Sequence, residues 1–193
     1  PGHAQAGDVR VDGVDLAAWV TRARPGLRRR IALFLRICDA VAFAHRALIV
    51  HRDLKPANVL VDADDEPKLL DFGIAKLVED DTEAQTRTVA AGLTLRYAAP
   101  EQVLGDRTTT ATDVYALGVV LFELIARRSP YRAADMAEAP WRDAVLRGDV
   151  HALGDVLGDA ALDAIDSRLA ARELAPVVRK AMALSPAERY SGV

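Results

Sequence analysis

Hydrophobic residues recur at steps of three and four along residues 28–47, which predicts an amphipathic helix there. A shorter helix is expected just before it, because Asp15 stands where an N-cap would and Pro25-Gly26 then breaks the chain. The basic run 28–30 is interpreted as the solvated start of the long helix. The residues expected on its apolar face are Ile31, Phe34, Leu35, Cys38, Val41, Ala42 and His45.

The second half of the chain is predicted to be mainly helical. Residues 113–127 are apolar on almost all sides, which predicts a buried central helix, and the threonines at 108–110 are expected to cap its start. A more polar helix is predicted over 135–147. A largely helical segment should follow over 160–184, where Pro176 is tolerated only near a helix start.

Three short runs have a β-favouring composition, at 48–50, 58–61 and 68–72. A polar turn separates the last two, which predicts a β-hairpin. Residues 1–14 are rich in Gly and Asp and are expected to form a loop or the remnant of a hinge. The predicted fold class is therefore α+β, mainly α-helical with one small β-hairpin.

Composition excludes several classes of function. The chain has 193 residues with 25 basic and 28 acidic side chains, and this balance gives no reason to expect nucleic acid or an anionic membrane as partner. Its single cysteine, Cys38, cannot form an internal disulfide framework or a cysteine zinc site, which favours a reducing cytoplasm. The longest apolar stretch, 114–126, is too short to span a bilayer, so no membrane segment is expected.

Three motifs carry the chemistry of this sequence. Residues 51–58 read His-Arg-Asp-Leu-Lys-Pro-Ala-Asn, residues 71–73 read Asp-Phe-Gly, and residues 99–101 read Ala-Pro-Glu. In this order and spacing they resemble the catalytic loop and the DFG and APE segments of protein kinases. The strings 39–45 and 71–76 are similar to bacterial Ser/Thr kinases of the eukaryotic-like type. The resemblance implies the large lobe of a protein kinase, which transfers phosphate from ATP to hydroxyls of a protein substrate.

The spacing of two residues predicts a metal site. Phosphoryl transfer depends on positioning and charge stabilisation, and Mg²⁺ prefers hard oxygen ligands. Asn58 opens the first strand of the predicted hairpin and Asp71 closes the second. Because an antiparallel hairpin brings those ends together, the two side chains are expected to hold Mg²⁺ (or Mn²⁺) beside ATP.

The resemblance also implies roles in binding and transfer. Asp53 would orient the substrate hydroxyl, and Lys55 would contact the γ-phosphate. Leu60 would form the floor of the adenine pocket, and Asp15 would correspond to an acid near the ribose. Thr94 matches the Thr that lines the substrate site of Ser/Thr kinases, although a Leu replaces the Gly that usually precedes it.

Other matching residues are expected to be structural. Asp113 would hydrogen-bond the backbone of the catalytic loop, and His51 would pack within that loop. Glu101 and Arg189 would form a buried ion pair beneath the substrate site. The residues read from pattern alone as packing or core-edge residues, rather than as ligands, are His45, Cys38, Trp19 and Trp141.

Regulation by phosphorylation is a further implication of the resemblance. Arg52, directly before the expected catalytic Asp, marks the kinases that are usually controlled by phosphorylation of their activation loop. Thr86 and Thr88, with Thr82 less favoured, lie in a polar stretch that reads as a long surface loop. A homodimer would allow autophosphorylation in trans.

No Gly-x-Gly-x-x-Gly loop and no Val-Ala-Ile-Lys strand occurs in the sequence. Both belong to the small lobe of kinases, so residues 15–193 are expected to be a large lobe, truncated before its last helix, that binds ATP weakly and transfers little phosphate. The full-length protein could be anchored in a membrane by a segment absent here.

Two alternatives to an active kinase remain open. One is a pseudokinase-like binding or regulatory module, and the other is a small-molecule phosphotransferase of kinase-like fold. The presence of Asp53, Asn58 and Asp71 together favours a catalytic origin, and Lys55 with the Ala-Pro-Glu segment favours a protein kinase.

Overall fold

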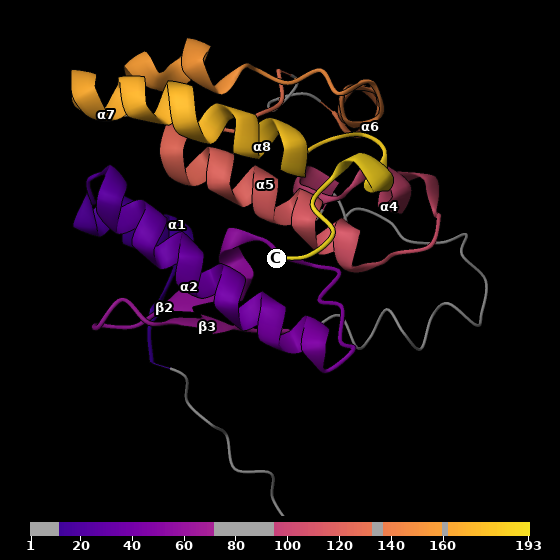
Figure 1. Cartoon of the computed structure of the whole chain (residues 1–193), viewed down its shortest axis with the longest axis horizontal. Helices are drawn as coiled ribbons and strands as arrows, with labels where there is room; N and C mark the ends of the chain where they lie inside the picture. Colours follow the sequence, from indigo (N-terminus) through magenta and orange to yellow (C-terminus); the bar gives the residue numbers. More distant parts are fainter. Residues whose placement is uncertain (1–11, 72–94, 133–136, 160–161) are drawn as a thin grey trace, which may run out of the picture.

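The computed structural model describes residues 12–71, 95–132, 137–159 and 162–193. These residues form a mainly helical molecule with one small sheet, in agreement with the expected fold class (Figure 1). The helices are α1 (Leu16–Ala23), α2 (Leu27–Arg46), α4 (Pro100–Leu104), α5 (Thr110–Ala126), α6 (Glu138–Arg147), α7 (Ala164–Leu169) and α8 (Ala175–Ala181), with a π-helical stretch (Ala170–Leu174) between the last two. The strands are β1 (Val14–Asp15), β2 (Val59–Val61) and β3 (Pro67–Leu69), and the 3₁₀ turns are η1 (Pro56–Asn58), η2 (Leu95–Tyr97), η3 (Leu153–Asp159) and η5 (Pro186–Glu188).

Helix α5 is the centre of the fold, as its all-round apolar pattern predicts. It buries 14 of its 17 residues, and the Thr109 side chain caps its start by accepting a hydrogen bond from the backbone N–H of Ala111. Gly118 lets α8 approach closely, because a Cβ at this position would lie 2.9 Å from the Cβ of Ala181. Pro176 was expected near a helix start, and it lies in the first turn of α8.

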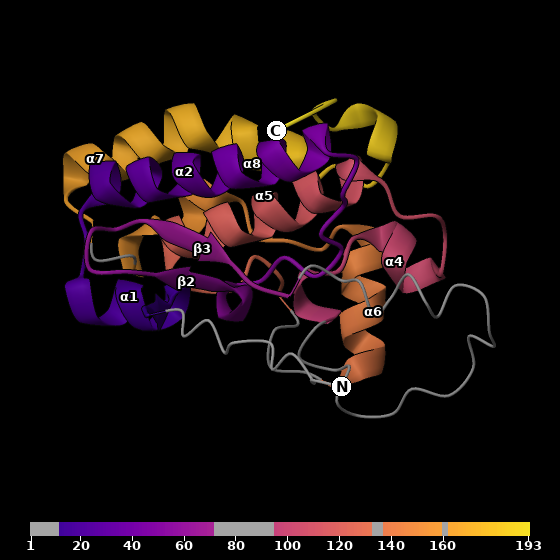
Figure 2. The same ribbon diagram turned by 90° about the horizontal axis from the view of Figure 1, so that it is seen from below.

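Three groups of buried side chains surround α5. The first joins it to α1, α2 and the hairpin and includes Trp19, and the second joins it to η3, the π-helical stretch and α8. The third joins it to α4 and α6 and includes Trp141. Figures 1 and 2 show α5 between these groups of elements. Both tryptophans are packing residues, as expected.

The sheet is antiparallel, in the order β1-β2-β3. The predicted hairpin is confirmed as β2 and β3, with Val59 opposite Leu69. The sheet also has a strand that the sequence analysis missed, because Val14, expected in a loop, pairs with Val61. A strand of two residues is too short to produce a recognisable alternation of polar and apolar positions.

The predicted apolar face of α2 was displaced by one residue. Its buried positions are Leu27, Arg30, Leu33, Ile37, Val41 and Ala44, whereas most of the expected positions flank this stripe and Leu35 is 57% exposed. The reason is Arg30, which was expected to be solvated but lies on the buried face. Its Nη1 donates to the carbonyls of Leu124 (3.0 Å) and Ile125 (2.9 Å) at the end of α5. A cation on the buried face interrupts the apolar pattern there.

The run 48–50 does not form a strand, although its composition is β-favouring. Leu48 N–H donates to the carbonyl of His45 (2.9 Å) and Ile49 N–H donates to that of Ala44 (3.0 Å), which is the Schellman ending of a helix. This ending requires a left-handed residue, and Leu48 takes that place with φ of 61° while remaining 93% exposed. The hydrogen bonds of the helix ending and the exposure of Leu48 to solvent outweigh the β propensity of these residues.

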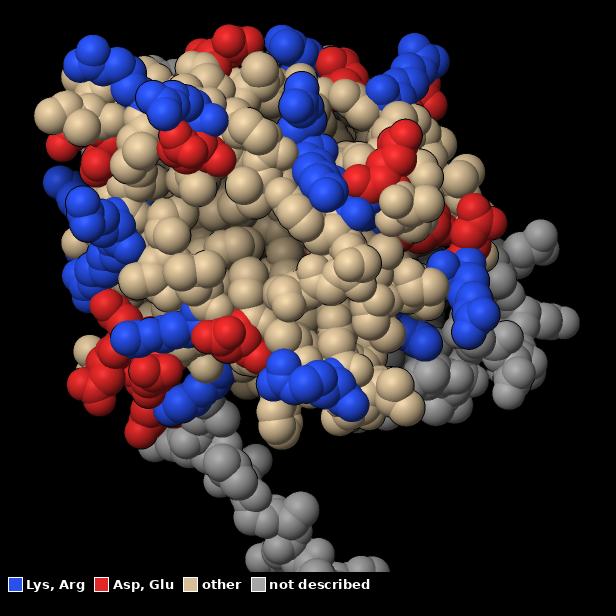
Figure 3. All heavy atoms as spheres, viewed as in Figure 1, with Lys and Arg blue, Asp and Glu red and all other residues tan. Residues whose placement is uncertain are grey.

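Charges of both signs are interspersed over the face shown in Figure 3. They surround an uncharged and hollowed middle. This mixture of signs is in keeping with the near balance of 25 basic and 28 acidic residues in the sequence.

Candidate active site

The loop between α2 and β2 gathers three of the expected site residues. Asp53 Oδ2 accepts hydrogen bonds from Lys55 Nζ (2.8 Å) and from Asn58 Nδ2 (3.1 Å). Asn58 Nδ2 also donates to the backbone carbonyl of Asp53 (2.8 Å), which closes the loop into the 3₁₀ turn η1. Asn58 is buried, whereas Asp53 and Lys55 are half-buried. The Asp53 carboxylate, the Lys55 ammonium group and the Asn58 amide therefore lie in hydrogen-bond contact within one short loop.

Asp113, in the first turn of α5, holds this loop from beneath. Its carboxylate is 1% exposed and accepts from the backbone N–H groups of His51 (2.8 Å) and Arg52 (2.9 Å). Gln102 of α4 donates its side-chain amide to the carbonyl of Arg52 (2.8 Å). These bonds hold Arg52 in a left-handed conformation, with φ of 66°, immediately before Asp53. The loop conformation is therefore fixed by two neighbouring helices.

The base of the hairpin brings Asp71 toward Asn58. Leu70 N–H donates to the carbonyl of Asn58 (2.9 Å), and this bond closes the base of the hairpin. Asp71 directly follows Leu70, is exposed and has φ of 49°. His51 joins the loop to the same point, because its Nε2 lies 3.0 Å from the carbonyl of Leu70. Burial lowers the pKa of His51, so the neutral imidazole donates this bond at neutral pH.

The oxygens at the base of the hairpin suit a hard cation. Asn58 uses its amide nitrogen for the loop bonds, which leaves the amide oxygen for a ligand, and Asp71 adds an exposed carboxylate. Among the described residues no three His, Cys, Asp or Glu side chains converge on one point. Two protein oxygens fit Mg²⁺, which keeps several waters and takes further ligands from substrate phosphates. They do not fit a structural zinc site.

Glu101 and Arg189 form a buried ion pair with two parallel hydrogen bonds. Arg189 Nη1 and Nη2 donate to the two carboxylate oxygens of Glu101 at 2.7 and 2.8 Å. Thr112 Oγ1 also donates to Glu101 (2.9 Å), and Arg189 lies over the ring of Tyr115. Burial opposes the ionisation of Glu101, but the bonds from Arg189 outweigh it and hold the pKa of Glu101 below its usual value. The pair joins α4 to the C-terminal segment beside α5.

Two other expected residues are neighbours in the sheet. Asp15 pairs with Leu60 across β1 and β2, so the expected ribose acid and adenine-pocket residue lie opposite each other. Asp15 also caps α1, as predicted, because its Oδ1 accepts from the N–H of Ala18 (2.8 Å). Four expected residues, Thr82, Thr86, Thr88 and Thr94, lie outside the described residues.

The sequence analysis missed the role of His45. Its Nε2 lies 2.7 Å from Asp113 Oδ2, so the histidine supports the same carboxylate that anchors the loop. The histidine was expected to be a core-edge residue, which agrees with its half-buried position, but its partner is 68 positions away. No periodic pattern can reveal a contact at that distance in sequence.

Comparison with known proteins identifies the family. The model of the protein kinase domain matches residues 11–191. The chain is 36% identical over 184 residues to a probable serine/threonine-protein kinase of Corynebacterium efficiens, covering 94% of this chain and 26% of that protein. It is 34% identical over 181 residues to the serine/threonine-protein kinase PknB of Mycobacterium tuberculosis, covering 93% and 27% of the two proteins.

The chain therefore spans about a quarter of the length of these two curated relatives. In the part of the chain that the structure describes, no helix is both long and apolar enough to cross a bilayer. The family match extends over the catalytic-loop, DFG and APE motifs alike. By this match and by its relatives, the chain belongs to the protein kinase domain family, in the group of bacterial Ser/Thr kinases.

Proposed function

We propose that this chain is the large lobe of a Ser/Thr protein kinase that transfers the γ-phosphate of ATP to hydroxyl groups of proteins. The observation that carries the proposal is the contact of Asp53 with both Lys55 and Asn58 in a loop that Asp113 holds in place. Phosphoryl transfer needs positioned charges rather than covalent catalysis by the protein, and this cluster is rigidly positioned.

Each residue of the cluster has a distinct proposed role. Asp53 accepts or orients the proton of the substrate hydroxyl, and Lys55, now 2.8 Å from that carboxylate, neutralises charge on the transferred phosphate. The Asn58 amide oxygen and the Asp71 carboxylate hold Mg²⁺, which neutralises charge on the phosphates when it is bound. Leu60 and Asp15, opposite each other in the sheet, contact the adenosine part of ATP.

The substrate class rests on two residues. Lys55 in the loop is typical of Ser/Thr kinases, and Thr94 completes the substrate site in this proposal. The Ala-Pro-Glu segment that leads into α4 distinguishes the chain from small-molecule phosphotransferases of kinase-like fold. A pseudokinase role is disfavoured because Asp53, Asn58 and Asp71 are all present.

We expect the 193-residue chain alone to transfer phosphate weakly, because it contains neither a glycine-rich phosphate loop nor a Val-Ala-Ile-Lys strand. Phosphorylation at Thr86, Thr88 or Thr82 stays a prediction. Mass spectrometry of an active, upstream-extended protein tests it, and absence of phosphate from residues 74–96 would contradict it.

The decisive experiment compares labelled ATP transfer by this chain and by an upstream-extended chain, with Mg²⁺ or Mn²⁺ and a basic protein substrate. Asp53→Asn should abolish labelling of Ser and Thr in the extended chain, while Asp39→Asn, at an exposed position of α2, should not. Labelling that survives Asp53→Asn would contradict the catalytic role. No labelling by either chain would favour the pseudokinase alternative.

A further inference from the structure

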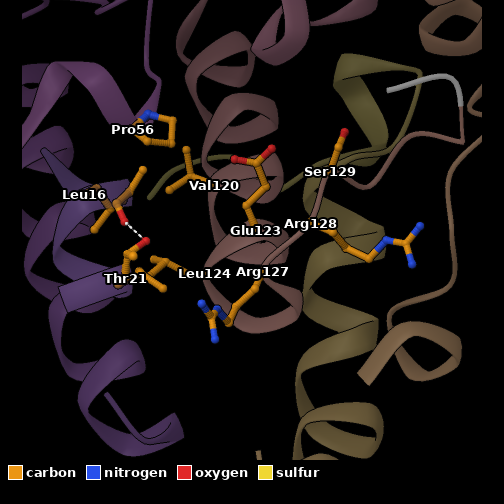
Figure 4. A pocket seen from close by; sticks show the side chains of 11 residues that line it. Leu16, Thr21, Pro56, Val120, Glu123, Leu124, Arg127, Arg128 and Ser129 are labelled. Atoms are coloured by element: carbon orange, nitrogen blue, oxygen red, sulfur yellow. Dashed lines mark hydrogen bonds between the residues drawn. The ribbon is translucent and has the colours of Figure 1, made fainter. Parts of the chain in front are cut away.

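Two features of the described surface offer room for a partner. One is a pocket of about 280 Å³ between α1 and α5, which belongs to the candidate active site because Pro56 of the loop between α2 and β2 lines it (Figure 4). The other is the outer face of α7 and α8, which lie across α5 from the hairpin (Figures 1 and 2). This second face takes no part in the proposed phosphoryl transfer, so its side chains need a separate explanation.

The helical run from α7 through the π-helical stretch to α8 has one buried and one exposed side. Ala170, Leu174 and Val178 recur every four residues and pack into the second group of buried side chains. Exposed positions alternate with them on the opposite side. We call this side the outer stripe, and its members are Ile165, Arg168, Leu169, Arg172, Glu173 and Val177.

The outer stripe is unusually apolar for an exposed surface. Ile165 is 73% exposed, Leu169 47% and Val177 37%. Single exposed apolar side chains are normal on protein surfaces, but several on one face of one helical run indicate a contact surface.

The π-helical stretch helps to keep these apolar side chains on one face. Eight residues separate Leu169 from Val177, and an α-helix completes about 2.2 turns over that length, which would leave the two side chains about 80° apart. A π-helix takes more residues per turn, so the stretch Ala170–Leu174 reduces this offset. Single π-helical turns inside α-helices are rare and occur frequently at functional sites.

The charges of the outer stripe are complementary to those of a second copy. Arg168 is exposed, its Nε donates to the carbonyl of Ala164 (3.1 Å), and within the described ranges no carboxylate is bonded to it. Glu173 lies 2.9 Å from Arg172 and is more than half exposed. Two antiparallel copies related by a two-fold axis near residue 171 would bring Arg168 of each copy beside Glu173 of the other. A parallel pair would instead bring like charges together.

We propose that the outer stripe is a self-association surface, on which two copies of this chain pack their α7–α8 runs antiparallel. Ile165 of each copy packs against Val177 of the other, and the two Leu169 side chains lie on either side of the axis. The helical run is about 27 Å long at the α-helical rise, so the interface is below the roughly 1,200 Å² of stable complexes and association is weak. The inference does not depend on the proposed kinase function.

Sedimentation velocity of the 193-residue chain tests the proposal directly. From about 5 to 500 μM we expect a reversible rise from monomer toward dimer mass, as a small interface allows. Leu169→Glu should weaken dimerisation about tenfold or more, because symmetry removes the apolar contact twice. Leu35→Glu is the matched control, since Leu35 is 57% exposed on α2 and lies outside the stripe. Circular dichroism and melting temperatures establish that every variant is folded.

Reversal of single charges tests the pairing across the axis. Arg168→Glu and Glu173→Arg should each weaken dimerisation about tenfold, because each variant places two pairs of like charges in its own dimer. An equimolar mixture of the two variants should dimerise as the wild type does, since opposite charges again face each other. Arg28→Glu, an equal change of charge at an exposed position of α2, should have no effect.

Three results would overturn the proposal. The first is a chain that remains monomeric at the highest concentration, which would leave the outer stripe to a different protein. The second is a dimer that Leu35→Glu dissociates and Leu169→Glu does not. The third is a failure of the mixed charge variants to associate better than either variant alone. Because every readout is a mass in solution, these results are independent of whether Asp53-dependent transfer is observed.

Discussion

Single residues in this molecule are explained by contacts that lie far apart in sequence. Asp113 accepts hydrogen bonds from two N–H groups of the loop and also contacts His45. The motifs pointed to the first of these interactions but not to the second. Arg30 shows the limit of pattern more clearly, since a basic run suggests solvent whereas the side chain bonds to carbonyls 94 and 95 positions away. Residue types in motifs could be predicted, but partners of buried polar groups outside motifs could not.

The Glu101–Arg189 pair gives a prediction about stability and pH. Glu101→Gln removes the charge that balances a buried guanidinium and should lower the free energy of unfolding at pH 7 by about 3–5 kcal/mol. Because the pKa of Glu101 is lowered in the folded state, this contribution is present above the unfolded pKa of about 4.3 and is lost as pH falls through the folded pKa. Urea unfolding from pH 7 down to acid checks both statements.

The control for this pair is Glu173→Gln. Glu173 lies 2.9 Å from Arg172, but both side chains are more than half exposed. Exposed pairs contribute about 0–1 kcal/mol, so this variant should change stability little. Equal losses in the two variants, or a difference between Glu101→Gln and wild type that grows below pH 4.3, would contradict the assignment.

Leu48 should be replaceable by glycine with a gain in stability. Its φ of 61° is unfavourable for a branched side chain, by about 1–2 kcal/mol, and its 93% exposure means that little packing is lost. Thermal and urea unfolding of Leu48→Gly should therefore show an increase of about 1 kcal/mol. Ala47→Gly, at the preceding residue with φ of −84°, should instead be destabilising, and a loss of stability in Leu48→Gly would show that the leucine has a packing role.

At the scale of elements, the hairpin is fixed at both of its ends. Its base bonds to the catalytic loop through Leu70, and its tip bonds to α1 and α2 through Asp65. The strands and their turn were predicted from composition, because short β-favouring runs around polar residues leave few alternatives. The attachment of the tip could not be predicted, since it depends on where two helices lie relative to the turn.

Asp65→Ala should loosen the tip of the hairpin. The Asp65 carboxylate accepts from Trp19 Nε1 (2.8 Å) and from Arg29 Nε (2.7 Å) and Nη2 (2.9 Å). We expect a loss of about 1–2 kcal/mol, since these are charge-assisted bonds at a partly exposed site. Hydrogen exchange should speed up at residues 59–69 before it does in α5. Asp64→Ala, at the neighbouring exposed acid, is the control and should leave exchange unchanged.

The whole molecule is organised around α5, which contributes to all three groups of buried residues. The existence and type of the long helices could be predicted because they depend on summed apolar periodicity. The face of α2 and the ending at Leu48 could not, because a buried arginine and a left-handed leucine each break the local rule. The motifs indicated the active-site cluster and the Asp113 carboxylate beneath it by residue type, and the fold adds His45, which contacts that carboxylate.

A shared central helix should make the molecule unfold as one unit. The two tryptophans report on different groups, Trp19 between α1, α2 and the hairpin and Trp141 between α6 and α5. Fluorescence of Trp141→Phe and of Trp19→Phe should therefore give single urea transitions, each coinciding with the circular dichroism of the same variant. If α5 did not couple the groups, the Trp141 signal would change at a lower urea concentration than the helical signal, because α6 is a short polar helix at the edge of the fold. Coincidence would mean that the loop anchored by Asp113 is protected by the stability of the entire domain, so a destabilising change near α6 would also weaken the active-site cluster.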